Sequence, residues 1–320
     1  MKIPLSLSVY EHAAKLIGET PWNVSRDPQL LFQAHAAAYE IYRHTPVVVG
    51  IDIYNLEAEA YGCIIDNPGG TGIPAVTKPL FASLDDALRL TPLAGDEGRI
   101  PSFITVAARL KRKFRDADIR MPISGPFSIA VNLIGMEALM MAAVLEADKI
   151  RELLDAIVDG QLAFVRTVHD RGIGIAFFES AAAPPLLSPD TFKETELPAL
   201  KRVIGGTRDI IGRAVPCIIG GDTTPLIPHM LATGTNFLIC PAETNRELFL
   251  KEMEYHPDVN VRVNLNPALY TSGTENEIAR EVDAVVALAR GRKNILLGTG
   301  GIPYETPVEN ILFLKKYACG

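Results

Sequence analysis

Short apolar runs alternate with longer amphipathic segments along this chain from residue 46 onward. The short runs are nearly continuous in Val, Ile, Leu and Phe, as is typical of parallel strands that are buried on both faces. They are TPVVVGIDIY (45–54), MPISGP (121–126), GIGIAFFES (172–180), AVPCIIGGD (214–222), TNFLIC (235–240), VNVRVNLN (259–266) and NILLGTG (294–300). We therefore predict seven parallel strands, and we place an eighth near GTGIPAVTK (71–79).

The segments between these runs have the apolar spacing of helices. Residues 147–172 place Ile150, Leu153, Ile157 and Val165 on one helical face. Residues 274–291 and 306–318 begin with a threonine followed by acidic residues, which are favourable in the first turn of a helix. Strands that alternate with helices predict an α/β fold, a single closed (β/α)8 TIM barrel. We assign the barrel to residues 45–320 and a helical N-terminal extension to residues 1–44.

Composition and charge exclude several classes of protein. A net charge of −7 over 320 residues argues against nucleic acid or an anionic membrane surface as a partner. No run approaches 18 uninterrupted apolar residues, and the first residues lack the cleavage site of a signal peptide. Four cysteines without CxxC spacing indicate neither a disulfide framework nor a zinc finger. We expect a cytoplasmic protein without a membrane or nucleic-acid partner, and we leave a homodimer open.

The predicted strand ends supply the candidate site residues, because active sites of such barrels lie at the carboxyl ends of the strands. Gly298, Gly300 and Gly301 follow the last apolar run, where they would let the backbone approach a ligand. The polar or sulfur-containing residues at strand ends are Asp52, Ser124, Glu179, Ser180, Asp222, Cys240, Asn264, Asn266 and Thr299.

The three carboxylates in this set have alternative explanations. Glu179 follows four apolar residues and either accepts hydrogen bonds from loop backbone, acts as a general base, binds a cation or ligates a metal. Asp52 alternates with Ile51 and Ile53, and we expect it in the barrel mouth, where it must be paired or hydrogen-bonded. Asp222 either caps the following helix or belongs to a turn that binds an anion or a carbonyl group.

The amides and the cysteine are equally open to two interpretations. Asn264 and Asn266 suit hydrogen bonding to a neutral or zwitterionic ligand, although Asn266 precedes a proline and also shapes a turn. Cys240 is either an inert small hydrophobe or a zinc ligand together with Glu179. In the second case His229 or Asp222 would supply a third ligand.

Four segments, in order along the chain, resemble the uroporphyrinogen decarboxylase superfamily, which also contains the cobalamin-dependent methyltransferases. PVVVGIDIYNLEAEAYG has Asp52 where the decarboxylases have an active-site aspartate, and ISGPFSIAVNLIG has Asn132 where they have a tyrosine. FFESAAAPPLLSP places Glu179 and Ser180 in register with an active-site strand end. LGTGGIPYETPVEN has Thr299 where the decarboxylases have a histidine. The resemblance implies a barrel whose mouth holds these residues.

Two departures from the family pattern narrow the function. A porphyrinogen with many carboxylates needs a basic cleft, and the segment AHAAAYEIYRHTP contains no arginine-rich loop. The GDTT turn, the NLNP strand end, GTENEI and PYETPVEN resemble the methyltransferases more closely. However, methylcobalamin:coenzyme M methyltransferase-like members hold zinc through a His-x-Cys pair and a later cysteine. Here Ile218 and Gly220 stand at the first two positions, and GTGGIP contains no cysteine.

From the resemblance we expect a corrinoid-dependent methyltransferase that acts with a separate cobalamin-binding protein and a small methyl donor or acceptor. The alternatives are a metal-free decarboxylase or lyase acting on a smaller acid, and a non-catalytic ligand-binding barrel. In the first hypothesis Glu179 and Asp52 are catalytic, and zinc stays open, with Cys240 and Glu179 as ligands. The expected substrate contacts are Asn132, Ser180, Asp222, Asn264, Asn266, Tyr270 and Thr299, and Gly298, Gly300 and Gly301 face the cofactor.

Overall fold

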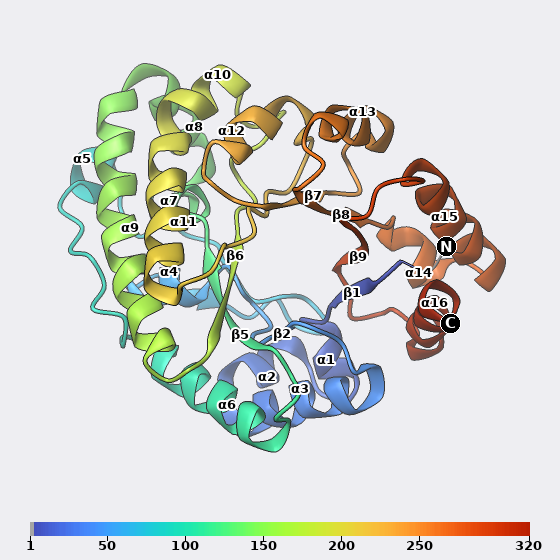
Figure 1. Cartoon of the computed structure of the whole chain (residues 1–320). Coiled ribbons are helices and arrows are strands. Elements are labelled where there is room, and N and C mark those ends of the chain that lie inside the picture. Colours follow the sequence, from blue (N-terminus) through green and yellow to red (C-terminus); the bar gives the residue numbers. More distant parts are fainter. Residues whose placement is uncertain (1–2) are drawn as a thin grey trace.

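The strands of the computed structural model, which describes residues 3–320, surround one central axis, and helices cover them on the outside (Figure 1). Two parallel ladders have the orders β2–β5–β6 and β7–β8–β9–β1. Residues 217–219 join them through single parallel bridges, Glu179 to Ile219 and Cys217 to Leu238. The strands are β1 (Leu5–Ser8), β2 (Val47–Val48), β5 (Ile119–Ser124), β6 (Gly174–Phe178), β7 (Phe237–Cys240), β8 (Asn260–Asn264) and β9 (Ile295–Gly301).

The ring of strands is not closed by hydrogen bonds. Among residues 3–320, no ladder joins β1 to β2. A side-chain contact spans the gap, in which Ser6 Oγ donates to the carbonyl oxygen of Thr45 at 3.5 Å. The α/β arrangement with a central parallel sheet is as predicted, but the closed ladder is not.

The predicted eighth strand is wrong, and a different segment takes its place. Residues 71–79 contain β4 (Ala75–Val76), which pairs antiparallel with β3 (Ile65–Asp66) in a separate two-stranded sheet. The eighth position of the ring belongs to β1, which lies in the segment that we predicted to be helical. The sequence LSLS alternates apolar and polar residues, so it lacks the continuous apolar run that marks the other strands.

Helices begin and end at residues with the expected capping chemistry. Asp27 accepts hydrogen bonds from the backbone of Gln29 and Leu30, and Thr274 forms a capping box with Glu277. The helices are α1 (His12–Lys15), α2 (Pro21–Arg26), α3 (Pro28–Tyr42), α4 (Leu56–Ala60), α5 (Leu84–Ala87), α6 (Ile100–Lys113), α7 (Pro126–Ile134), α8 (Met136–Leu145), α9 (Ala147–His169), α10 (Pro189–Thr191), η1 (Phe192–Glu196), α11 (Leu197–Ile211), η2 (Thr224–Leu226), α12 (Ile227–Leu231), α13 (Arg246–Glu252), η3 (Met253–Tyr255), α14 (Pro267–Ser272), α15 (Glu275–Leu288) and α16 (Val308–Cys319).

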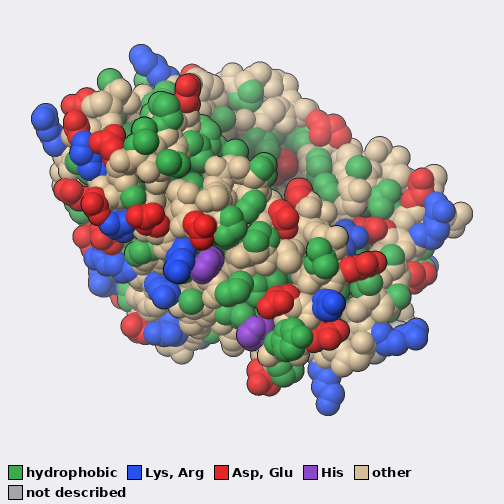
Figure 2. All heavy atoms as spheres, turned by 90° about the horizontal axis from the view of Figure 1, so that it is seen from above, with side chains coloured by type: hydrophobic (Ala, Val, Ile, Leu, Met, Phe, Trp, Pro, Cys, Tyr) green, Lys and Arg blue, Asp and Glu red, His purple; other side chains and the backbone are tan. Residues whose placement is uncertain are grey.

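The main apolar core lies between the strands and the surrounding helices. Its members include Leu153 and Leu154 of α9, Leu200 of α11 and Val263 of β8, all fully buried. Each such side chain stabilises the fold by roughly 1.5–3 kcal/mol relative to an exposed position. On the surface, acidic and basic side chains are interspersed, and acidic atoms lie inside a recess near the upper edge of Figure 2.

In the described part of the chain, no single helix has the length and hydropathy needed to cross a membrane. The pair α7 and α8 meets the criteria only when the two helices are taken together across a bend of 115°.

Candidate functional site

A cavity of about 480 Å³ lies at the carboxyl ends of the barrel strands, and we call it the upper cavity. Its volume falls in the range of small-molecule sites. The predicted site residues that line it are Asp52, Glu179, Asn264, Gly300 and Gly301. The charged side chains of the lining are Glu11, Asp52, Glu179, Glu243 and Arg262.

Glu179 follows β6 and lies inside a set of hydrogen-bond donors. Its Oε1 accepts from the backbone N–H groups of Ser180 at 2.8 Å and Ala181 at 2.9 Å. Ser128 donates from its N–H at 3.2 Å and from its hydroxyl group. Burial raises the pKa of Glu179, and these donors partly oppose that effect because they favour the charged carboxylate. The side chain is only 1% exposed, so its position and its ionisation are both controlled by the protein.

Gly125 provides the space that Glu179 occupies. A Cβ atom at residue 125 would overlap Oε2 of Glu179 and lie 2.5 Å from its Cδ. The φ angle of Gly125 is −65°, so the requirement for glycine is steric rather than conformational. The segment Ser124-Gly125-Pro126 therefore brings the start of α7, and with it Ser128, against the Glu179 carboxylate.

A second buried carboxyl group, Glu196, lies close enough to Glu179 for their charges to interact. Neither of its oxygens has a hydrogen-bond partner within residues 3–320. Burial, and secondarily the charge of Glu179, raises the pKa of Glu196 well above its usual value. Glu196 ends the π-helical turn η1, a type of irregularity that is frequent at functional sites. The sequence pattern did not predict the position of this carboxyl group.

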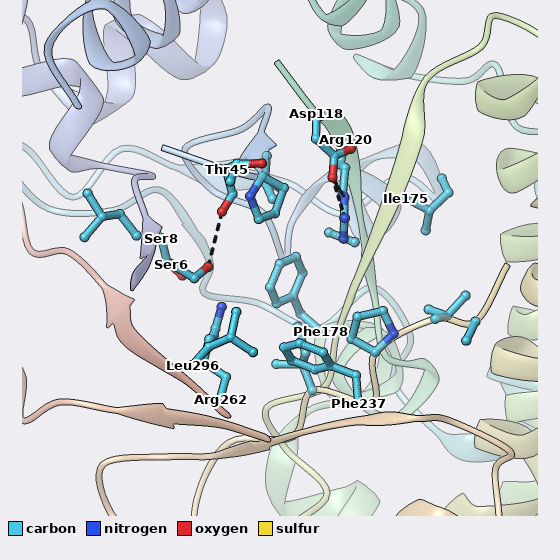
Figure 3. A pocket seen from close by; sticks show the side chains of 18 of the residues that line it. Ser6, Ser8, Thr45, Asp118, Arg120, Ile175, Phe178, Phe237, Arg262 and Leu296 are labelled. Atoms are coloured by element: carbon cyan, nitrogen blue, oxygen red, sulfur yellow. Dashed lines mark hydrogen bonds and ion pairs between the residues drawn. The ribbon is translucent and has the colours of Figure 1, made fainter. Parts of the chain in front are cut away.

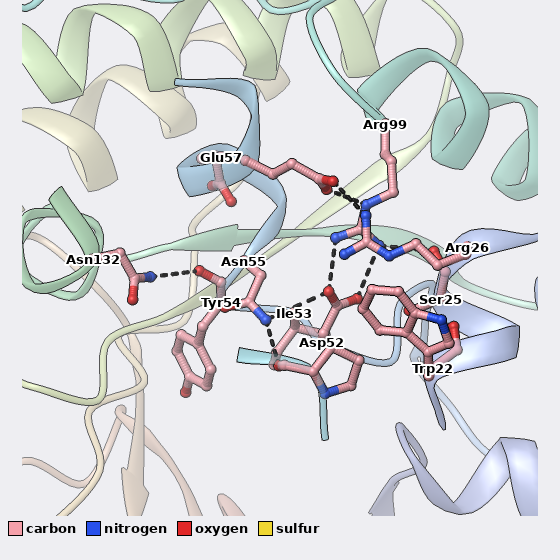
Figure 4. Close-up of polar contacts among 12 residues, drawn as sticks. Trp22, Ser25, Arg26, Asp52, Ile53, Tyr54, Asn55, Glu57, Arg99 and Asn132 are labelled. Carbon is pink, nitrogen blue, oxygen red and sulfur yellow. Dashed lines mark hydrogen bonds and ion pairs between the residues drawn. The ribbon is translucent and has the colours of Figure 1, made fainter. Parts of the chain in front are cut away.

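Asp52 is held by a bidentate ion pair with Arg99 (Figure 4). Nη1 and Nη2 of Arg99 donate to Oδ1 and Oδ2 of Asp52 at 3.1 and 2.7 Å. Arg99 also pairs with Glu59, which in turn pairs with Arg26. Both oxygens of Asp52 are thus engaged, and the ion pair fixes the wall formed by residues 51–55.

Asn264 points inward from β8 and retains an unused acceptor. Its Oδ1 has no hydrogen-bond partner in the described part of the chain, although the side chain is only 7% exposed. Its backbone carbonyl accepts from Nη2 of Arg246 at 2.9 Å. A buried polar atom of this kind is available to a ligand that carries a donor.

Four other predicted residues do not line the upper cavity. Thr299 accepts a hydrogen bond from the backbone N–H of Ser8 at 2.9 Å, so its hydroxyl group joins β9 to β1. Asn132 donates to the carbonyl oxygen of Tyr54 at 3.3 Å. Tyr270 is buried with its hydroxyl group unpartnered among residues 3–320. Gly298 packs against Arg262 from below the rim of the cavity.

Three of the remaining predicted polar residues are at the surface, whereas Ser124 is buried and its N–H donates to Glu57. Asn266 caps α14 by accepting from the N–H of Ala268 at 3.0 Å, so it shapes the turn. Asp222 accepts from the N–H of Thr224 at 3.2 Å in an exposed turn. Ser180 is exposed, and its hydroxyl lies 3.2 Å from that of Ser128.

The residues present do not fit a zinc ion. Cys240 is buried outside the lining, its thiol donates to the carbonyl oxygen of Pro241 at 3.8 Å, and burial raises its pKa to about 12. Within residues 3–320, no three His, Cys, Asp or Glu side chains are grouped as metal ligands. Ile218 and Gly220, at the expected His-x-Cys positions, line the upper cavity. In the described part of the chain, Cys240 and Glu179 therefore have no third ligand.

Glu11, Tyr10 and Arg262 are lining residues that the sequence interpretation missed. Burial, and secondarily the charge of Glu305, raises the pKa of Glu11 to about 7. Glu11 follows the carboxyl end of β1, so it was overlooked together with that strand. Arg262 carried a usable signal, since the alternation in VNVRVNLN places it on the same side of the strand as Asn264.

The sequence profile of the family described as uroporphyrinogen decarboxylase (URO-D) matches residues 2–318. The chain belongs to this family. A methylated-thiol–coenzyme M methyltransferase of Methanosarcina mazei is 27% identical over 308 residues, which cover 89% of this chain and 75% of the relative. The methylcobamide:CoM methyltransferase MtbA of Methanosarcina acetivorans is 25% identical over 280 residues, covering 86% and 79%.

Decarboxylases are also among the relatives of this URO-D chain. A uroporphyrinogen decarboxylase of Parasynechococcus marenigrum is 26% identical over 299 residues, covering 89% of this chain and 81% of the relative. A solved methyltransferase structure from Methanosarcina mazei superposes with a TM-score of 0.84 at 21% identity, covering 99% of this chain and 93% of the other. The structural likeness establishes the fold, and the relatives show that the URO-D resemblance is correct.

Proposed function

We propose that this URO-D protein transfers a methyl group between a small substrate and a corrinoid carried by a separate protein. The observation that carries the proposal is the size and charge of the upper cavity, taken with the near full-length similarity to two methyltransferases. A cavity of about 480 Å³ suits a small molecule, and a corrinoid macrocycle would have to remain at its mouth.

The charges of the cavity argue against a porphyrinogen as the substrate. Four of the five charged lining residues are carboxylates, and the only cation among them is Arg262. A substrate with many carboxylates would find one cation to pair with, and the ionised forms of Glu11, Glu179 and Glu243 would repel it, since like charges in one cleft are unfavourable. Uroporphyrinogen decarboxylation therefore fits this cavity poorly.

In the proposed reaction the residues of this chain bind the substrate and control its proton. The corrinoid supplies the cobalt centre that carries the methyl group. Glu179 has a raised pKa and a fixed position, so it can give a proton to the demethylated group or remove one from the acceptor. The Asp52–Arg99 ion pair holds the facing wall in place, which keeps the substrate oriented toward the mouth.

A lyase or decarboxylase acting on a smaller acid is the second candidate. Arg262 favours it, because this buried cation could hold a single carboxylate. Release of CO₂ from a small acid without any corrinoid protein would distinguish this activity from methyl transfer.

The test of the proposal is the single-turnover rate of methyl transfer in Glu179→Gln. Glutamine keeps the size of the side chain and an acceptor for the N–H groups of Ser180 and Ala181, but it cannot exchange a proton. We expect a loss of rate on the order of 100-fold or more. Glu137→Gln, on the exposed side of α8, is the matched control and should keep the full rate. An unchanged rate in a folded Glu179→Gln variant removes Glu179 from the mechanism.

A further inference from the structure

Arg262 is a buried arginine without a partner among the residues that the structure describes. It is 8% exposed and points from β8 into the interior of the barrel. No ion pair or hydrogen bond of its side chain is found among residues 3–320, and its Nε is completely enclosed and unpartnered. Arginine remains protonated in proteins, so a full positive charge lies inside the barrel. An isolated buried charge is costly, so the protein must have a use for it.

The barrel makes room for this side chain at Gly298. A Cβ atom at residue 298 would lie 2.6 Å from Cδ and 2.7 Å from Cγ of Arg262. It would also lie 2.7 Å from Oδ1 of Asn264. Gly298 therefore allows the stem of Arg262 to lie beside the unpartnered amide oxygen of Asn264. The two unpaired groups are neighbours.

Arg262 forms part of the wall between two cavities. The upper cavity contains Glu179, and a lower cavity of about 390 Å³ lies at the amino ends of the strands. Ser8, Tyr10, Phe178, Ile218 and Arg262 line both cavities. The rings of Tyr10 and Phe178 contact each other edge to face at 6.0 Å. Arg262 is thus the charged group at the floor of the upper cavity.

Two other arginines line the lower cavity, and neither is a buried, unpaired charge, because Arg213 is exposed and Arg120 has an acidic partner. Arg120 of β5 pairs with Asp118, with Nε donating to Oδ2 at 2.9 Å (Figure 3). The groups that act electrostatically on Arg262 are the phenols of Tyr10 and Tyr270, and burial raises the pKa of both. They carry no charge near pH 7. Of these three arginines, Arg262 is therefore the buried one whose charge no residue in 3–320 compensates.

We propose that Arg262 binds the single oxyanion of the substrate, a carboxylate or a sulfonate, at the floor of the upper cavity. The guanidinium group has the planar donors that pair with two oxygens of such an anion. The anion would compensate the buried charge, and the reacting end of the molecule would point upward toward Glu179. This inference rests on the proposed function only in taking the upper cavity as the substrate site.

Anion binding can be tested without knowing the substrate. The melting temperature of the full chain is measured by calorimetry in sodium propionate, sodium ethanesulfonate, propionamide and sodium chloride at equal concentration. We expect the propionate or the ethanesulfonate to raise the melting temperature above that in chloride, by about 2 °C at ten times its dissociation constant. Whichever anion gives the larger shift identifies the oxyanion class. Propionamide, which is neutral, should give no shift.

Variants locate the effect. Arg262→Met keeps the length of the side chain without its charge and should abolish the shift, whereas Arg262→Lys should retain part of it. Arg120→Met is the matched control in the lower cavity and should respond like the wild type. Without an anion, Arg262→Met should be at least as stable as the wild type, because it removes an unpaired buried charge.

Three results would overturn the inference. They are an equal shift in Arg262→Met, no anion-specific shift in the wild type, and a loss of folding in Arg262→Met, since the last would mean that Arg262 has a structural partner. Failure of methyl transfer leaves these melting temperatures unaffected, so the proposed function and this inference can fail independently.

Discussion

The replacement Gly125→Ala tests whether the structure has the correct environment for Glu179. The added methyl group would overlap Oε2 of Glu179 and lie 2.5 and 2.7 Å from its Cδ and Cβ. Since Glu179 is fixed by Ser128, Ser180 and Ala181, it cannot turn away without breaking those hydrogen bonds. Overpacking of this kind costs about 1–3 kcal/mol. We therefore expect the free energy of unfolding of Gly125→Ala to fall by about that amount.

Urea denaturation of matched variants measures this cost. Gly300→Ala is the control for stability, because a Cβ atom at residue 300 would meet no atom within 4 Å. It should change the free energy of unfolding by less than about 0.5 kcal/mol. In a Glu179→Gly background, which removes Cβ as well as the carboxylate, the methyl group at residue 125 has room, so Gly125→Ala should then cost almost nothing. A full loss of stability in that background, or none in the wild type, would refute this account of Glu179.

Two further predictions concern stability. Glu57 is fully buried and accepts from the N–H of Ser124 at 2.8 Å, and burial raises its pKa to about 7 from 4.5. The folded state therefore binds the proton of Glu57 more tightly than the unfolded state does. The free energy of unfolding of the wild type, relative to that of Glu57→Gln, should be largest below pH 4.5 and fall by about 3 kcal/mol by pH 7. Urea denaturation across this pH range measures the difference, and a difference that does not change with pH would contradict the prediction. Thr299→Val removes the acceptor of the buried Ser8 N–H and should lower the free energy of unfolding by about 1–3 kcal/mol, whereas Thr299→Ser should lower it less. Equal stabilities of the two variants would show that this hydrogen bond contributes nothing.

The parallel strands with continuous apolar runs could be predicted from the sequence. β1 could not, because its alternating LSLS pattern has a polar face that meets Thr299 and the barrel interior rather than solvent. Residues 71–79 misled the prediction because β4 finds an antiparallel partner in β3, and local sequence does not indicate which strand will pair with which.

For the site, the rule that strand ends meet at one mouth correctly brought Asp52, Glu179 and Asn264 into one cavity. The partners of these residues were not predictable, since Arg99 lies 47 positions after Asp52 and reaches it only through the folded chain. Thr299 was predicted to be a site residue from its place at a strand end and its alignment with the family. Its hydroxyl group instead accepts from Ser8 of β1, the strand that the prediction missed. Arg262 could have been predicted, because it is a charged residue within an otherwise buried strand. A charge in such a position often indicates a functional role.

Absorbance of a corrinoid protein tests the central claim of methyl transfer most directly. The chain is mixed with a corrinoid protein and small methylated carboxylates or sulfonates, and the cobalt spectrum is recorded over time, with reactions lacking the chain as controls. The account predicts a change from the unmethylated to the methylated cobalt spectrum that requires both the chain and a methylated oxyanion. A spectrum that never changes, together with CO₂ release from a small acid by the chain alone, would contradict methyl transfer and establish the lyase.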